Sequence, residues 1–167
     1  MIKNIKLGFF LYALLFFCLT SCAGNPGKEK KVFTGIVLDE KSEPVSEMEL
    51  DIKTPDGKKL RLWTDDEGFF YIPETKNGKF SFHGEKAGYS ELEEKLEVRN
   101  LVKIYCFQVQ SADSIFDEVE GLVILERYKE AVERLKSINS GKNKDLKDCI
   151  DFYKKRLTEA LNAKGLN

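Results

Sequence analysis

The sequence predicts a mainly β protein in which a seven-stranded β-sandwich over residues 31–109 is followed by a small α-helical unit over residues 111–163. In the first region, short stretches of alternating apolar and polar residues recur about every ten residues and are separated by turn-forming residues. Short strands at this spacing are typical of a β-sandwich. From Ser111 onward, the apolar residues follow the spacing of amphipathic helices instead.

The strands are placed by their alternation and by the turns between them. Residues 48–52 alternate between apolar and charged side chains, as expected of a half-buried strand, and Pro55-Asp56-Gly57 follows as a turn. Residues 60–64 and 69–72 flank the acidic turn 65–68, which predicts a hairpin. The other strands are expected at residues 31–38, around Phe80 and Phe82, and at residues 92–98 and 101–109.

Helical spacing of apolar side chains is found at residues 115–123, 128–138 and 146–161. Ser111 or Asp113 is expected to cap the first helix. Asn139-Ser140-Gly141 separates the second helix from the third, because Gly is a good helix terminator. No strong helix breaker separates the first two helices, so the sequence leaves open whether they are continuous.

Five short elements in the β region occur in a characteristic order: Gly35-Ile36-Val37 with Asp39, Pro44-Val45, residues 64–70, Gly78-Lys79-Phe80, and Gly88-Tyr89. This series resembles the carboxypeptidase regulatory-like domain, a transthyretin-type or prealbumin-like β-sandwich. The resemblance implies a domain without catalytic residues that serves as a spacer or an accessory interaction module.

The N-terminus has the features of a lipoprotein signal peptide. Lys3 and Lys6 precede an apolar stretch at residues 7–19, which is the length of a secretory h-region and too short to span a membrane well. Leu19-Thr20-Ser21-Cys22 resembles a bacterial lipobox, which implies that residues 1–21 are removed and that Cys22 carries a diacylglyceryl thioether and an acylated amine, with palmitate-type chains. Several acyl chains give stable membrane anchoring.

This resemblance also implies a location. Residues 22–30 are rich in Gly and Pro near their start and are expected to form a tether, with the body outside the cytoplasm in the cell envelope. By analogy with bacterial lipoproteins, Ala23 after the cysteine favours the outer membrane in an organism that has one. The body then lies in the periplasm or at the cell surface.

Composition limits the class of partner. The chain has 27 basic and 28 acidic residues, and the loss of Lys3 and Lys6 with the signal peptide changes the net charge from −1 to −3. The two signs are interspersed, whereas a nucleic-acid-binding protein is expected to carry a basic patch. Cys106 and Cys149 are expected to be buried as small apolar residues, and whether they pair stays open.

No residue pattern indicates catalysis, a metal site or a cofactor. His83 is the only histidine, so a histidine-based metal cluster or catalytic triad has no second member. Three adjacent acids, Asp65, Asp66 and Glu67, cannot converge on one calcium ion and are expected to serve turn formation. The sequence therefore predicts a protein that is not an enzyme and holds no cofactor.

Exposed aromatic residues are the best candidates for a contact surface. Because neighbouring strand residues point to opposite faces, Phe69 and Tyr71 are expected on the outer face, with Phe70 inside; Trp63 can join either set. We expect the helical tail to cover these rings; contact with a protein partner or stacking on a glycan are the alternatives.

A second set of candidate contacts lies in the helical unit. Tyr128-x-x-Ala131 followed by Leu135 and Ile138 resembles a helix of a tetratricopeptide repeat. This resemblance makes Tyr128, Leu135 and Ile138 candidate partner contacts. The predicted function is a membrane-anchored protein-interaction or assembly module of the cell envelope, and the alternative is a glycan-binding module.

Overall fold

The computed structural model describes residues 31–165, so the predicted signal peptide, the lipidated Cys22 and the tether lie outside the described residues. No helix within residues 31–165 is both long enough and apolar enough to cross a membrane. The described elements, in chain order, are β1 (Phe33–Leu38), β2 (Glu49–Lys53), β3 (Lys59–Trp63), β4 (Phe69–Ile72), β5 (Gly78–Glu85), β6 (Tyr89–Ser90), β7 (Leu92–Val98), β8 (Ile104–Gln108), α2 (Ala112–Ile124), α3 (Tyr128–Lys136), β9 (Ile138–Asn139) and α4 (Lys144–Ala163).

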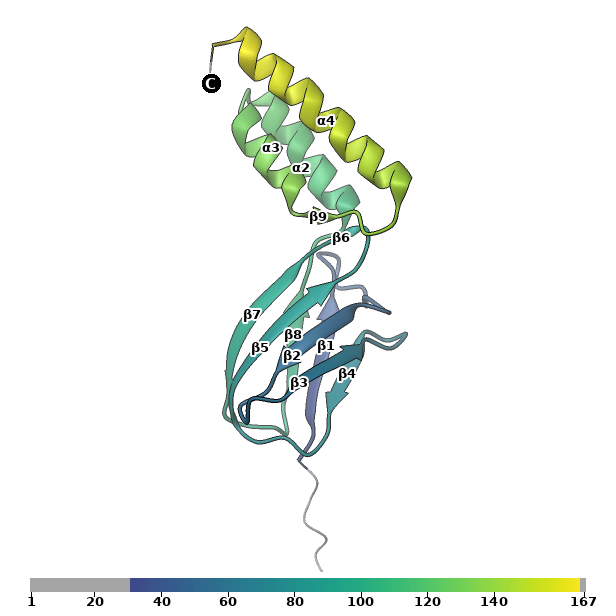
Figure 1. Cartoon of the computed structure of the whole chain (residues 1–167), viewed down its shortest axis with the longest axis vertical. Helices are drawn as coiled ribbons and strands as arrows, with labels where there is room; N and C mark the ends of the chain where they lie inside the picture. Colours follow the sequence, from purple (N-terminus) through teal and green to yellow (C-terminus); the bar gives the residue numbers. More distant parts are fainter. Residues whose placement is uncertain (1–30, 166–167) are drawn as a thin grey trace, which may run out of the picture. The chain divides into compact units, whose positions relative to one another are not determined.

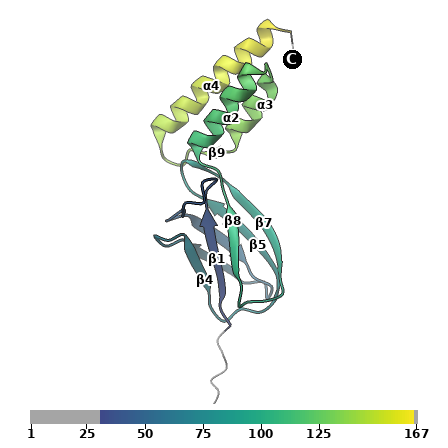
Figure 2. The same ribbon diagram turned by 180° about the vertical axis from the view of Figure 1, so that it is seen from behind.

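The strands form three sheets, and the three described helices follow β8 in the chain, with β9 between α3 and α4 (Figure 1). This β-rich arrangement with C-terminal helices is as the sequence predicted. One sheet has the order β4-β1-β8 and another the order β3-β2-β5-β7, while β6 and β9 form a small third sheet. The pair β1–β8 is parallel, and the other pairs are antiparallel. The four-stranded sheet faces the viewer in Figure 1, and the three-stranded sheet does so in Figure 2.

Aromatic rings fill the core between the two larger sheets. The ring of Phe33 in β1 lies 5.2 Å from that of Phe80 and 5.5 Å from that of Phe82, both in β5 of the other sheet. Phe82 in turn lies 4.7 Å from Phe107 in β8. Burial of rings of this size dominates the stability of a small core, and Phe33, Phe80 and Phe82 are each no more than 2% exposed.

Alternation along the strands is confirmed by the burial of side chains. Met48, Leu50 and Ile52 in and before β2 are at most 2% exposed. Phe70 is also buried, and its ring lies directly over Gly35, the residue opposite it in β1. A Cβ on Gly35 would lie 2.2 Å from the ring of Phe70, so only glycine leaves room for this ring.

The predicted hairpin at residues 65–68 is wrong, because β3 and β4 belong to different sheets. Thr64 is hydrogen-bonded to the segment that precedes β2. Its backbone N–H donates to the Met48 carbonyl at 3.1 Å, and its hydroxyl donates to the Val45 carbonyl at 2.6 Å. The turn that follows carries the chain across to the other sheet, where the N–H of Val37 donates to the Gly68 carbonyl at 2.9 Å.

The three helices pack on one another around a shared apolar cluster. The hydroxyl of Ser111 accepts a hydrogen bond from the N–H of Ser114 at 3.3 Å, so Ser111 is the N-cap of α2. Helices α2 and α3 are separate, because Glu126 between them has a φ of 58° in the left-handed region. This break answers the question that the sequence left open.

The helical part is tied to the sheets by hydrogen bonds at its start. The carboxylate of Glu40 accepts from the N–H of Ser111 at 2.9 Å and from its hydroxyl at 2.7 Å. Strand β6 pairs with β9, which lies between α3 and α4. The guanidinium of Arg134 in α3 donates to Gln110, which lies between β8 and α2, and within the helical part it donates to Glu118 of α2.

The prediction that Cys106 and Cys149 are buried is wrong, since both are exposed and both are free thiols. Cys106 precedes Phe107, which occupies the inward position of β8, so the alternation of the strand places Cys106 on the outer side. Cys149 precedes Ile150, which takes the buried position on α4.

Replacing Phe70 with alanine is expected to lower the free energy of unfolding by about 3–5 kcal/mol, because it leaves a ring-sized cavity over Gly35. Tyr71→Ala, at the neighbouring exposed position, is the matched control and is expected to cost far less. Chemical denaturation of both variants measures the difference. Equal losses would show that the inward and outward positions of β4 are misassigned.

Candidate interaction surfaces

The outer side of the three-stranded sheet has no charged side chain in the two rows that span all three strands. Its cross-strand rows follow from the register: Tyr71, Thr34 and Ile104 form one row across β4, β1 and β8, and Phe69, Ile36 and Cys106 form the next. We call these six residues the apolar face. None of them is charged, although a third of all residues in the chain are.

The apolar face is partly open to solvent, since Tyr71, Ile104 and Cys106 are exposed while Thr34, Ile36 and Phe69 are half-buried. Tyr71 is 51% exposed and Ile104 is 60% exposed, and Val102, just before β8, is 92% exposed. The rings of Phe69 and Tyr71 lie side by side with centroids 6.3 Å apart and planes inclined by 18°. Contiguous exposed apolar side chains of this kind mark sites of interaction.

The outward placement of Phe69 and Tyr71 is as the sequence predicted, but the expected cover by the helical tail is wrong, and Trp63, whose side the sequence left open, joins neither set. The helical tail does not cover Tyr71, which stays half exposed because the helices pack on one another. Trp63 belongs to β3 in the other sheet, where it is 57% exposed and lies opposite Glu49. The structure therefore does not bring Trp63 together with the other two rings.

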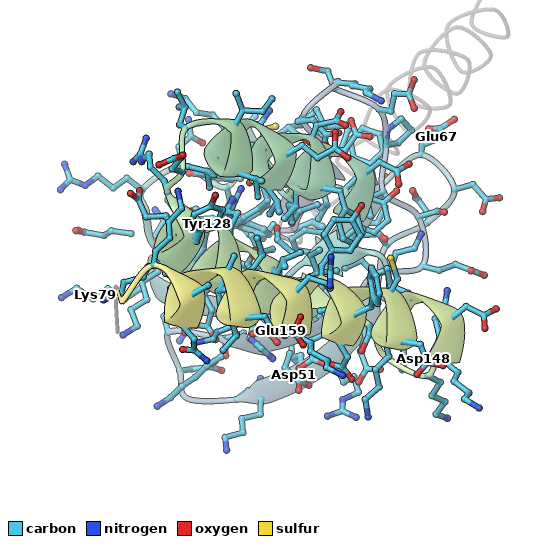
Figure 3. All side chains as sticks on the ribbon, turned by 90° about the horizontal axis from the view of Figure 1, so that it is seen from above. Asp51, Glu67, Lys79, Tyr128, Asp148 and Glu159 are labelled. Carbon is cyan, nitrogen blue, oxygen red and sulfur yellow. The ribbon has the colours of Figure 1, made fainter. Side chains whose placement is uncertain are left out.

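The helical candidates differ in accessibility. Leu135 and Ile138 are 0% and 7% exposed and fill the cluster between the helices, so neither offers a surface to a partner. Tyr128 is half-buried at the start of α3 (Figure 3) and lines a hollow of about 240 Å³ together with Leu161. The ammonium of Lys164 lies 5.1 Å from the centre of the Tyr128 ring.

Sequence reasoning missed Ile36, Ile104 and Cys106. The alternation of residues 33–38 places Ile36 opposite to Phe33, so its outward position was available from the sequence once Phe33 was assigned to the core. Ile104 and Cys106 reach the same face only because β8 pairs with β1 in parallel, and that long-range pairing leaves no local signal in the sequence.

The outer side of the four-stranded sheet is charged, and we call it the charged face. Arg61 bridges two carboxylates of β2, at 2.9 Å from Asp51 and 2.9 Å from Glu49. The hydrogen bonds from Arg61 hold the pKa of Asp51 below its usual range. These pairs are exposed to solvent, so each contributes little to stability.

His83 occupies the middle of the charged face. Its Nε2 lies 2.8 Å from Glu85 and its Nδ1 lies 2.9 Å from Glu93. The hydrogen bond to Glu85 and then that to Glu93 raise the pKa of His83. Two carboxylates on one imidazole therefore favour the doubly protonated ring.

The acidic turn serves the backbone, as predicted. The carboxylate of Asp65 accepts from the N–H of Glu67 at 3.1 Å and from that of Phe69 at 2.8 Å. Within residues 31–165, no three His, Cys, Asp or Glu side chains are grouped as a metal site would require.

No protein-family model and no curated protein matches this sequence. Solved structures match over about half of the chain. One is hydroxyquinol 1,2-dioxygenase from Pseudomonas putida, with 15% identity and a TM-score of 0.41 over 48% of this chain and 56% of that one. Another is the major pilin subunit BcpA of Bacillus cereus, with 16% identity and a TM-score of 0.38 over 49% of this chain and 28% of that one. A third is a DUF3823 family protein from Parabacteroides merdae, with 6% identity and a TM-score of 0.37 over 49% of this chain and 45% of that one. At this level the likeness concerns the β-sandwich fold alone.

These neighbours correct one prediction. Hydroxyquinol and catechol 1,2-dioxygenases stand among them, which contradicts the prediction that the chain is not an enzyme. The likeness to these enzymes is weak, with identities of 9–15% and TM-scores of 0.38–0.41.

The raised pKa of His83 predicts a pH-dependent contribution to stability. The protonated ring is the form that Glu85 and Glu93 stabilise, so the contribution is fully present below the unfolded-state pKa near 6.5 and is lost as the pH rises through the higher folded-state pKa. The stability difference between the natural chain and His83→Gln should therefore be larger at about pH 5 than at about pH 9. A difference that does not change with pH, or an NMR titration at or below 6.5, would contradict this assignment.

Proposed function

We propose that this chain is a lipid-anchored protein of the bacterial cell envelope that binds a protein partner through its apolar face. Cys22 carries the anchor, and the body lies outside the cytoplasm, at the outer membrane where the organism has one. The helical unit adds a second potential contact at Tyr128. The observation that carries the proposal is the uncharged, half-exposed outer side of the sheet β4-β1-β8.

The absence of charged side chains from the apolar face supports a protein partner with an apolar surface. An outer sheet face normally carries polar side chains, as the four-stranded sheet does with Arg61, Asp51 and His83 in one row. The apolar face instead presents isoleucine and aromatic side chains, and the cores of protein interfaces are depleted in charge and enriched in aromatic residues. A partner that buries Tyr71 and Ile104 removes this surface from water.

The finer description of the fold is part of the proposal. We assign the strands of the two larger sheets to one seven-stranded, prealbumin-like sandwich spanning residues 31–109, of the carboxypeptidase regulatory-like type. The helices at residues 111–163 then form a separate unit of tetratricopeptide-like character. Gly35 and Gly68, which belong to the motif series, both support this assignment because each stands where a Cβ would clash.

Glycan binding is the second candidate function, and one observation favours it. The exposed ring of Tyr71 lies beside Phe69 in a nearly parallel arrangement, which offers a stacking platform for a sugar ring. Retention of the natural chain on cell-wall polysaccharide, lost in Tyr71→Ala without loss of stability, would support this alternative over a protein partner.

Photo-crosslinking in intact cells tests the protein-binding proposal. A photoreactive phenylalanine analogue at Tyr71 is expected to yield one discrete crosslinked protein, and the same analogue at Trp63, which is exposed on the charged face, is expected to yield none. Both substitutions replace an exposed aromatic ring, so they are matched controls.

A charge on the apolar face completes the design. Ile104→Lys is expected to abolish the crosslink from Tyr71, because it places an ammonium in the interface, whereas Ile124→Lys on α2 is expected to leave it unchanged. Both isoleucines are exposed, at 60% and 80%, so neither change disturbs a core. A crosslink from Trp63, or one that survives Ile104→Lys, would contradict the proposal.

A further inference from the structure

We propose that the end of the sandwich at which residue 31 lies binds the anionic headgroups of the membrane that carries the anchor. This inference rests on the proposed lipid anchor at Cys22. We call this end the proximal end and the opposite end of β1 the distal end. The surface that binds is a set of exposed lysines on the charged face and in the adjoining turns.

Three lysines lie in one cross-strand row. Lys59 of β3 stands opposite Lys53 of β2, Lys53 stands opposite Ser81 of β5, and Ser81 stands opposite Lys95 of β7. Like charges directly opposite each other in a sheet are unfavourable. None of the three lysines forms an ion pair with another residue in the described part of the chain. We call Lys53, Lys59 and Lys95 the lysine row.

The lysine row borders a hollow that suits an anionic group. A hollow of about 520 Å³ is lined by Lys53, Lys79 and Lys95 with Ser81, and apolar residues (Pro55, Phe80 and Leu96) line it as well. Glu97 also lines it, and this carboxylate is already paired with Arg99 at 3.5 Å. Three lysines and a serine that line one hollow can together bind a phosphate-containing headgroup at its mouth.

The turns at the proximal end add to the positive charge. The described chain starts here, since the Lys31 carbonyl accepts from the N–H of Thr75 at 3.2 Å. The side chain of Asn77 donates to the Arg99 carbonyl at 2.9 Å, which holds two of these turns together. The exposed basic residues of the turns and the chain start are Lys31, Lys58, Lys76, Arg99 and Lys103.

Few carboxylates offset this charge. Asp56 pairs with Lys58 at 3.2 Å, as Glu97 does with Arg99, and Glu74 is the third acid at the proximal end. At the distal end the balance is reversed, because residues 39–47 and the turn at residues 65–68 contain seven acids and Lys41, and Lys86, which donates to the Ser46 carbonyl, adds one more cation. The sandwich therefore has a positive end and a negative end, although the whole chain is nearly neutral.

Chain geometry brings the positive end to the membrane. From Cys22 to Lys31 the backbone can span at most about 30 Å, whatever its conformation. A lipid on Cys22 therefore keeps the proximal end close to the headgroups, where each lysine strengthens binding to an anionic surface about fivefold. The acidic distal end, including Glu40 with its bonds to Ser111, then faces away from that surface.

Lysine labelling on vesicles tests this orientation. The lipidated chain is reconstituted into phosphatidylcholine vesicles, with or without about 30% phosphatidylglycerol, and pulsed with an amine-reactive reagent before mass spectrometry. Labelling of the lysine row is expected to fall at least about threefold on the anionic vesicles, and roughly 0.5 M salt is expected to remove the difference. Lys142 and Lys147, which are exposed in the helical part, are expected to label equally on both.

Charge-reversed variants provide the second measurement. Lys53→Glu with Lys59→Glu and Lys95→Glu is expected to remove the protection of Lys79, whereas Lys142→Glu with Lys147→Glu and Lys155→Glu changes the net charge equally and is expected to preserve it. Equal labelling of the lysine row on neutral and anionic vesicles would overturn the proposal. Protection by soluble polyglutamate but not by anionic vesicles would also overturn it, in favour of an acidic protein partner.

The neutral vesicles separate this proposal from the anchor on which it rests. The natural chain is expected to float with phosphatidylcholine vesicles, and Cys22→Ala is not. If both fail to float, the anchor is wrong, and flotation with anionic vesicles at low salt then tests the proximal end alone. Loss of the lysine row must reduce that flotation, or the lipid-binding assignment also fails.

Discussion

The packing of Phe33 against the rings of the facing sheet sets the orientation of every strand around it. Its ring lies within 6 Å of those of Phe70, Phe80, Phe82 and Tyr105, so one side chain of the central strand β1 joins both sheets. With Phe33 inside, Thr34 and Ile36 must point outward, since neighbours in a strand alternate. The apolar face is therefore a consequence of how the core is filled.

Local sequence patterns were sufficient to place most strands and the helices along the chain. Buried residues such as Leu50, Phe82 and Ile115 belong to apolar series that recur every two residues in strands and every 3.6 residues in helices. They were not sufficient for strand pairing. Nothing near residues 65–68 distinguishes a hairpin from a crossing between sheets; the bonds of Thr64 to residues far away in sequence decide it. For the same reason, Tyr71 was recognised as an outward residue, but its neighbour Ile104 across β1 was not.

The two outer faces of the sandwich are proposed to have different functions: the charged face contacts the membrane at its proximal end, and the apolar face binds a protein partner. In the middle of the charged face, Arg61 and His83 form ion pairs with carboxylates. At the proximal end, the lysine row forms no such pairs within the described chain. The apolar face has no charged residues. The helices do not cover it, because their apolar side chains pack against one another. A protein held at a membrane by one end can in this way keep its other side free for a partner.

The reactivity of Cys106 and Cys149, the two thiols of residues 31–165, tests in cells whether the apolar face binds a partner. Cys106 lies on the apolar face and Cys149 lies on α4, and both are exposed and free in the isolated chain. Alkylation with a small reagent in intact cells, compared with the purified protein, measures how far each thiol is covered. Cys106 is expected to be protected in cells, whereas Cys149 is expected to react as in the purified protein. Equal reactivity of Cys106 in both settings would contradict the assignment of the apolar face as the partner-binding surface.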